Sequence, residues 1–222
     1  MDILLSDAIR RPCPALCVGV LEATVVNSEY DADLWARIGE AEADVRQRLT
    51  TETLKLQPGI RTTREAYKVL GKDPSRYRPS NEQLVRRVLQ GKELYQINTL
   101  VDINNLASIR WGYSIGGFDV DCIQGTRLTL GVGRAGEPYE GIGRGPLNIE
   151  GLPVYRDAAG GIGTPTSDHE RTKLSLSTTR LLFLINAYDG DVQQLRRCGE
   201  DLQQLLREFA RSDGGTFRII ED

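Results

Sequence analysis

The run NTLVDINNLASIR, residues 98–110, decides how the rest of the chain is interpreted. If this run is a helix, apolar side chains lie on most of its sides: Leu100, Val101, Ile103, Leu106, Ala107 and Ile109. A helix that is apolar on most sides is a buried one. Its polar residues Asp102, Asn104 and Asn105 must then be satisfied by partners inside the protein or by a ligand. The run therefore predicts a core helix whose polar residues are candidates for a binding site.

Helical spacing dominates before this run, and extended segments dominate after it. Apolar residues recur every three or four positions over residues 34–49, 63–70 and 80–91, so each of these segments is expected to be a helix. Ser80 is the expected N-cap of the third helix. Strands are expected at 15–27, 118–123, 126–132, 147–149, 153–156, 181–188 and 216–220, and a closing helix at 192–211. Helices first and short strands second, without regular alternation, indicate an α+β fold with helices packed on a small mixed or antiparallel sheet.

Composition describes an ordinary globular protein. The chain has 222 residues, of which 40% are hydrophobic and 27% are charged, and its net charge is −3. Its longest apolar runs are far too short to span a bilayer, and residues 1–7 are acidic and lack the apolar core of a signal peptide. We expect one compact domain over residues 1–222, in a soluble, cytoplasmic protein without a membrane partner.

The cysteines and the single histidine argue against a metal centre. Cys13 and Cys17 form one close pair, whereas zinc sites usually show two such pairs, and His169 is the only histidine. We expect the four cysteines to be small buried apolar groups, and we expect no metal and no cofactor.

Two glycine-rich segments need separate interpretations. Residues 131–136 match G-x-G-x-x-G, but a turn toward another strand follows where a dinucleotide site needs a helix, so we interpret them as a hairpin. In residues 141–145, GIGRG, alternate glycines leave one strand face without side chains. Either a ligand approaches the backbone there, or the segment is a bulge or a tight hairpin.

Polar and basic residues concentrate in two further places. Residues 164–172, TPTSDHERT, are either an exposed loop or a site containing Asp168, His169 and Arg171. Residues 61–92 carry nine basic and three acidic residues, a charge of +6 that leaves −9 for the rest of the chain. Such concentration favours an anionic partner such as nucleic acid over a solvated helix face.

A resemblance to a known family is carried by six short segments: YRPSNE (77–82), VDINNL (101–106), GGFD (116–119), GIGRG (141–145), LNIEG (147–151) and SDHERT (167–172). They resemble the free-standing relatives of the B3/4 domain, the editing module in the beta subunit of bacterial phenylalanyl-tRNA synthetase. The recognisable core is about 67–190. In that family the module hydrolyses tRNA charged with the wrong amino acid, in a pocket between a buried helix and a small sheet.

The resemblance implies a trans-editing aminoacyl-tRNA deacylase that binds mischarged tRNA, alone or beside a synthetase. Asn105 falls on the family's pocket asparagine, and Gly116 falls where the synthetase domain has a pocket histidine, so amino-acid preference must differ. The expected catalytic residues are Asn105, Glu150 and Asp168. The expected substrate-binding residues are Asp102, Gly116, Gly143, Arg144, Gly145, His169 and Arg171. The expected tRNA-binding residues are Arg76, Arg78, Arg86, Arg87 and Lys92.

Ester hydrolysis needs an aimed water, donors for the oxyanion, and recognition of the ammonium group. The peptide N–H groups of Gly143 to Gly145 would supply the donors, Asp168 or Glu150 would bind the ammonium, and Asn105 would orient water or a ribose hydroxyl. Two other interpretations stay open. The chain is either a non-catalytic module that binds tRNA or an amino acid, or a hydrolase of small amino-acid esters or amides.

Overall fold

A four-stranded antiparallel sheet lies at the centre of the fold, in a computed structural model that describes residues 1–221. Its strands, in spatial order, are β10 (Thr216–Ile220), β2 (Cys17–Thr24), β9 (Arg180–Ala187) and β3 (Ser114–Asp119). β2 and β9 pair along their full length, from Cys17 opposite Ala187 to Thr24 opposite Arg180.

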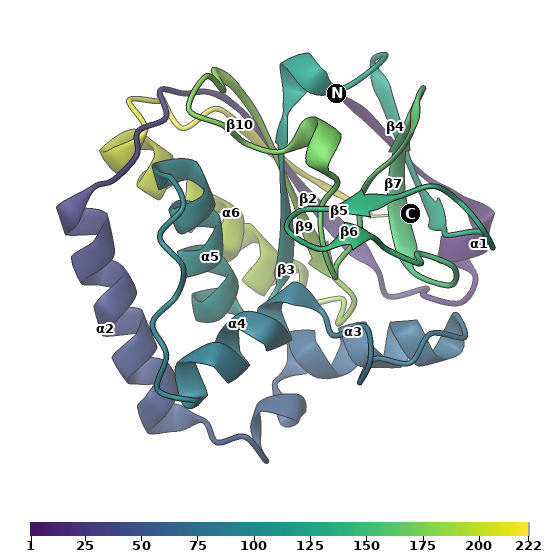
Figure 1. Ribbon diagram of the computed structural model, residues 1–222, viewed down its shortest axis with the longest axis horizontal. Helices are drawn as coiled ribbons and strands as arrows, with labels where there is room; N and C mark the ends of the chain where they lie inside the picture. The colour runs from purple at the N-terminus through teal and green to yellow at the C-terminus, as the bar shows by residue number, and fades with distance from the viewer. Residues whose placement is uncertain (222) are drawn as a thin grey trace.

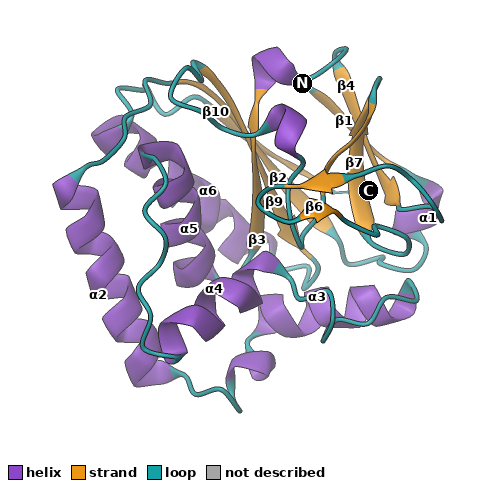
Figure 2. Cartoon of the chain, in the orientation of Figure 1, coloured by secondary structure: helices purple, strands orange, loops and turns teal. Residues whose placement is uncertain are grey.

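The two faces of this central sheet are covered differently, as Figures 1 and 2 show. Helices cover one face, where Leu21, Phe183 and Ile185 join the larger apolar core. A second sheet covers the other face, where Val20 and Leu184 join a separate core. Because side chains alternate along a strand, one apolar run serves two cores, and the fold has three layers.

The second sheet is mixed. Its strands are β1 (Asp2–Leu5), β4 (Arg127–Val132), β7 (Pro153–Asp157) and β8 (Gly160–Gly163), with β1 parallel to β4 and the other pairs antiparallel. A small hairpin of β5 (Glu140–Gly141) and β6 (Gly145–Pro146) stands apart from both sheets. The fold also contains 3₁₀ helices: η1 (Leu54–Leu56) lies in the helical part, η2 (Val120–Cys122) contacts β9, and η3 (Glu170–Thr172) contacts β8.

The helices are α1 (Asp7–Arg10), α2 (Ala32–Arg48), α3 (Pro58–Val69), α4 (Ser80–Leu89), α5 (Thr99–Trp111) and α6 (Val192–Phe209). Side chains at the N-cap accept hydrogen bonds from free backbone donors at the start of α2, α5 and α6. The side chain of Asn98 accepts a hydrogen bond from the Val101 N–H at the start of α5, and Gly112, with φ of 77°, ends that helix. Leu100, Ile103 and Leu106 are fully buried, which confirms the predicted core helix.

The α+β fold class is confirmed, and several details of the prediction are wrong. Ser80 does not cap α4, because Pro79 holds the N-cap position and no side chain accepts there. The strand expected at 118–123 begins at Ser114 and gives way to η2 after Asp119, where the Asp119 side chain accepts from the Asp121 N–H. Residues 147–149 form no strand.

Two strands were not predicted. β1 has four residues and a partner 125 positions away, and β8 reads Gly-Gly-Ile-Gly, which contains a single β-forming residue.

The 131–136 motif does not begin a helix, since the next regular element is β5. Three of the four cysteines are buried as expected, but Cys122 is exposed. Within residues 1–221 no helix combines the length and apolar character needed to cross a membrane.

Candidate functional site

A pocket of about 410 Å³ lies where α4, α5 and β3 meet the segment 164–174. We call it the Asp168 pocket. Its apolar lining consists of Leu84, Ile97, Val101, Ile115, Ile142, Pro165 and Leu174. Its polar lining includes Ser80, Asn104, Asn105, Ser108, Thr164, Ser167, Asp168 and Lys173, and the backbone of Gly117 completes it. An apolar cavity with a few convergent polar groups is the usual form of a small-ligand site.

Asp168 is the acidic group in this pocket. Its Oδ2 accepts a hydrogen bond of 3.0 Å from the Gly117 N–H. Burial raises the pKa of Asp168 from 3.8 to about 7. Its other oxygen, Oδ1, has no hydrogen-bond partner among the side chains and peptide groups of residues 1–221. A carboxylate with a pKa near neutrality and one free oxygen is suited to take up a proton at physiological pH.

Glycines make room for this carboxylate. A Cβ on Gly163 would lie 3.0 Å from Asp168 Oδ1 and 2.4 Å from the Phe118 ring. A Cβ on Gly116 would lie 3.3 Å from the same oxygen and 2.7 Å from the same ring. Gly116 therefore admits no side chain unless Phe118 moves, and it is Gly117, not Gly116, that lines the pocket.

Two amide side chains from α5 reach the same pocket. The side-chain amide of Asn105 has no hydrogen-bond partner within the part of the chain that the structure describes. Asn104 donates from Nδ2 to the Ile115 carbonyl at 3.0 Å, which fixes its amide, while its buried Oδ1 has no partner. A buried acceptor without a partner costs about 1 to 3 kcal/mol, so a donor on a ligand would bind it favourably. Burial of α5 predicts from the sequence that Asn104 needs a partner or a ligand, although Asn104 is not among the expected site residues.

Several expected substrate-binding residues lie elsewhere. Asp102 is buried and accepts from Trp35 Nε1 at 2.9 Å and from the Ile97 N–H at 3.2 Å, so it holds α5 against its neighbours. Burial raises the pKa of Asp102. Arg171 makes a two-pronged ion pair with Asp157, with distances of 2.8 and 2.9 Å. Neither Asp102 nor Arg171 lines the Asp168 pocket.

His169 follows Asp168 but takes a structural position. Its Nδ1 accepts a hydrogen bond of 3.0 Å from the Arg171 N–H, and its ring packs edge-on against Tyr139 at 4.9 Å. The pKa of His169 is lowered, mainly because the ring is partly buried. The structure thus separates His169 from the pocket that its neighbour lines.

The glycines of the β5–β6 hairpin are not free donors. The Gly143 N–H donates to Glu170 Oε1 at 3.1 Å, and the Arg144 N–H donates to the Gly141 carbonyl at 2.9 Å. Gly145 pairs with Gly141 across the hairpin, so residues 141–145 are a tight hairpin rather than a bare strand face. Of this hairpin only Ile142 lines the pocket, and the Arg144 side chain bonds Gln83 on α4.

Glu150 also lies outside the pocket. Its side chain is exposed, and its backbone carbonyl accepts a hydrogen bond of 2.6 Å from Lys72 Nζ. The three expected catalytic residues are thus only partly brought together: Asn105 and Asp168 share the Asp168 pocket, and Glu150 does not. No group of histidine, cysteine or acidic side chains in the described chain has the arrangement of a metal site.

The basic residues divide into structural and exposed ones. Glu82 is fully buried and pairs with Arg86 at 2.8 Å and with Arg64 at 2.7 Å, so these two arginines neutralise a buried carboxylate. Arg87 lies over the Tyr95 ring at 3.6 Å. The remaining expected tRNA-binding residues are exposed: Arg76, Arg78 and Lys92.

Comparison with known proteins identifies the family. Residues 62–210 match the family model described as B3/4 domain. The chain belongs to the B3/4 domain family. It is also similar to the crystal structure of an N-terminal fragment of the phenylalanyl-tRNA synthetase beta-subunit from Pyrococcus horikoshii, with a TM-score of 0.47 and 12% identity. The alignment covers 98% of this chain and 50% of that fragment, so the B3/4 chain spans half of its relative. No curated protein matches it by sequence.

Proposed function

We propose that this B3/4 chain is a trans-editing aminoacyl-tRNA deacylase, which hydrolyses the ester bond of mischarged tRNA with the aminoacyl group in the Asp168 pocket. The observation that carries the proposal is the pocket itself: an apolar cavity that contains a carboxylate with a pKa of about 7 and two incompletely bonded asparagines. Membership of the B3/4 family and the editing function implied by the sequence resemblance support the choice of substrate.

The pocket matches the parts of an aminoacyl group. Apolar side chains from α4, α5 and β3, among them Leu84, Val101 and Ile115, would surround an apolar amino-acid side chain. Asn104 Oδ1 would accept a hydrogen bond from the substrate ammonium, because it is a fixed acceptor that lacks a partner. Lys173 lies at the same pocket but pairs with Glu170 at 2.6 Å, which turns its charge away from that ammonium.

Asp168 would act as the general base. A water held by Oδ1 attacks the ester carbonyl carbon while its proton passes to Asp168. The bond between that carbon and the ribose oxygen then breaks, and the ribose oxygen takes the proton from Asp168, giving a free amino acid, uncharged tRNA and the regenerated carboxylate. The unbonded amide of Asn105 would donate to the developing oxyanion, since the hairpin N–H groups of Gly143 and Arg144 are already bonded.

The exposed basic residues would hold the tRNA. Arg76, Arg78 and Lys92 flank α4, whose residues Ser80 and Leu84 line the pocket. Contacts of this kind fix the position of a nucleic acid without reading its sequence.

The experiment that tests the proposal measures ester loss from a panel of mischarged and correctly charged tRNAs. Selective hydrolysis of one aminoacyl group, lost in Asp168→Asn and kept in the exposed matched variant Glu65→Gln, is the expected result. Tight binding of charged tRNA without turnover would support a binding module instead. Hydrolysis of small amino-acid esters that is insensitive to Arg78→Glu would support a small-molecule hydrolase.

A further inference from the structure

Exposed apolar side chains gather at the mouth of the Asp168 pocket. Ile97 and Ile142 line the pocket and are 57% and 40% exposed, so they lie where it opens to solvent. Tyr95, two residues before Ile97, is 60% exposed. Aromatic residues make up only 6% of the chain. An exposed ring beside a candidate substrate pocket is a candidate contact for the substrate.

Arg87 holds the Tyr95 ring from one side. Its guanidinium carbon lies 3.6 Å from the centre of the ring, and its Nε donates to the Glu93 carbonyl at 2.6 Å. The guanidinium group therefore covers one face of the ring in a cation–π contact. Because most of the Tyr95 side chain is still exposed, the opposite face of the ring is open to solvent and can stack on another flat ring.

The backbone on either side of Tyr95 is fixed. The Leu94 N–H donates to Glu42 Oε1 at 2.8 Å, and the Leu94 side chain is buried. The Ile97 N–H donates to Asp102 Oδ1 at 3.2 Å. The segment that carries the ring is thus anchored before and after it, although it belongs to no helix or strand. A ring that is already in place loses little conformational entropy when a ligand stacks on it.

The Arg87–Tyr95 stack lies close to the pocket. Leu84 and Ile97 line the pocket, one from α4 and one from the segment that follows it. Arg87 is one helical turn, about 5 Å, beyond Leu84 on the same side of α4. The Cα atoms of Tyr95 and Ile97 are at most about 7 Å apart. In a charged tRNA the aminoacyl group and the terminal base are attached to the same ribose, so an aminoacyl group in the pocket places that base near its mouth.

We propose that the open face of the Tyr95 ring stacks on the base of the terminal adenosine of charged tRNA while the aminoacyl group occupies the Asp168 pocket. This inference rests on the proposed deacylase function. Because every base has a flat π face, such a stack positions the substrate without reading its sequence. Arg87 acts as a positioning residue for the ring. The exposed Lys92, at the start of the same segment, adds positive charge for the neighbouring phosphates.

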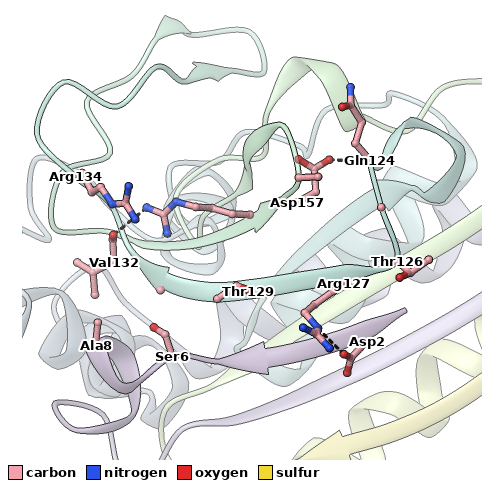
Figure 3. A pocket seen from close by; sticks show the side chains of 14 residues that line it. Asp2, Ser6, Ala8, Gln124, Thr126, Arg127, Thr129, Val132, Arg134 and Asp157 are labelled. Carbon is pink, nitrogen blue, oxygen red and sulfur yellow. Dashed lines mark hydrogen bonds and ion pairs between the residues drawn. The ribbon is translucent and has the colours of Figure 1, made fainter.

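A larger cavity elsewhere in the molecule offers no such partner for a base. It has a volume of about 900 Å³ and lies on the outer face of the sheet that contains β1, β4 and β7 (Figure 3). It shares no lining residue with the Asp168 pocket, and its lining, all within residues 1–221, includes no aromatic side chain. The exposed Arg134 in that cavity therefore serves as a control for the loss of an arginine away from the proposed stack.

The test compares uncharged tRNA with the same tRNA lacking its terminal adenosine, in filter binding at one salt concentration. We expect the wild type to bind the complete tRNA about tenfold more tightly, and Tyr95→Leu to bind the two tRNAs equally. Tyr95→Phe keeps the ring and should discriminate like the wild type. Both variants should melt near the wild-type temperature, because the side chain is exposed. Arg87→Ala should discriminate less, and Arg134→Ala should not.

The outcomes separate this proposal from the deacylase proposal. Equal discrimination by the wild type and Tyr95→Leu, or equal binding of the two tRNAs by the wild type, would overturn the stack. If the wild type then still hydrolyses charged tRNA, the deacylase proposal stands without it. If the wild type discriminates through Tyr95 but hydrolyses nothing, the stack stands and the deacylase proposal fails.

Discussion

Replacing Asp168 by asparagine should stabilise the protein at pH 8 while it abolishes hydrolysis. The carboxyl pKa is about 7 in the folded protein and 3.8 in an unperturbed chain, because burial disfavours the charged form. Between these values the folded protein binds more protons than the unfolded chain. Stability therefore falls as the pH rises from about 4 to about 7, and it levels off above the folded pKa.

The size of the effect follows from the same two values. At about 1.4 kcal/mol for each pH unit, the ionised carboxylate costs the folded state at most about 4 kcal/mol at pH 8. Asparagine has nearly the same shape, has no charge, and its amide oxygen can still accept from the Gly117 N–H. The raised pKa already includes the bond from the Gly117 N–H to the carboxylate, so we expect a net gain of up to about 4 kcal/mol at pH 8 and almost none at pH 4.

The assay is urea unfolding of the wild type and Asp168→Asn at both pH values. Other groups titrate equally in the two proteins and cancel in the difference between them. The exposed Glu65→Gln measures the effect of removing one negative charge, and its difference from wild type should be small at both pH values. If Asp168→Asn changes the unfolding free energy equally at pH 4 and pH 8, the carboxylate does not carry a raised pKa and the general-base role is refuted.

Three other variants separate site residues from structural ones. Asn105→Ala should lower the hydrolysis rate about 100-fold with little loss of stability, because this amide bonds nothing in the fold; an unchanged rate would remove it from the mechanism. Gly116→His, which places a histidine where the synthetase domain has one, should destabilise the protein by about 2 kcal/mol in thermal unfolding, because its Cβ would meet the Phe118 ring at 2.7 Å. Arg78→Glu combined with Lys92→Glu should weaken tRNA binding and flatten its salt dependence without changing the melting temperature; filter binding at two salt concentrations checks this.

The sequence predicted the helical half of the pocket better than the strand half. Leu100, Val101 and Ile103 surround α5 with apolar side chains, so the spacing of apolar residues predicted that this helix is buried and that its polar residues need partners or a ligand. The position of Asp168 did not follow, because its hydrogen-bond partner Gly117 is 51 residues away in sequence. Local patterns do not report such long-range contacts.

Glycines within strands carry information about the site that the spacing of apolar residues does not. Gly116 and Gly163 lie on different strands, and each has an absent Cβ that would crowd both the Phe118 ring and Asp168 Oδ1. Glycine inside a strand often marks a close approach by another group. Residues 141–145 also fit this rule by sequence, but they form a hairpin, and the close approach occurs at Gly163.

The charge count of residues 61–92 overestimates the number of basic side chains that are free on the surface to contact RNA. Counting residues 61–92 treats Arg64 and Arg86 as surface charges, but both pair with the buried carboxylate of Glu82. Removing either arginine would leave the buried Glu82 carboxylate incompletely neutralised. The folded state would then lose several kcal/mol of stability, about 3 to 5 kcal/mol where the ion pair is fully buried. Loss of tRNA binding in an Arg86 variant would therefore report a damaged fold. Arg78 is exposed and pairs with no acidic group among residues 1–221, so its reversal is the substitution that tests contact with tRNA.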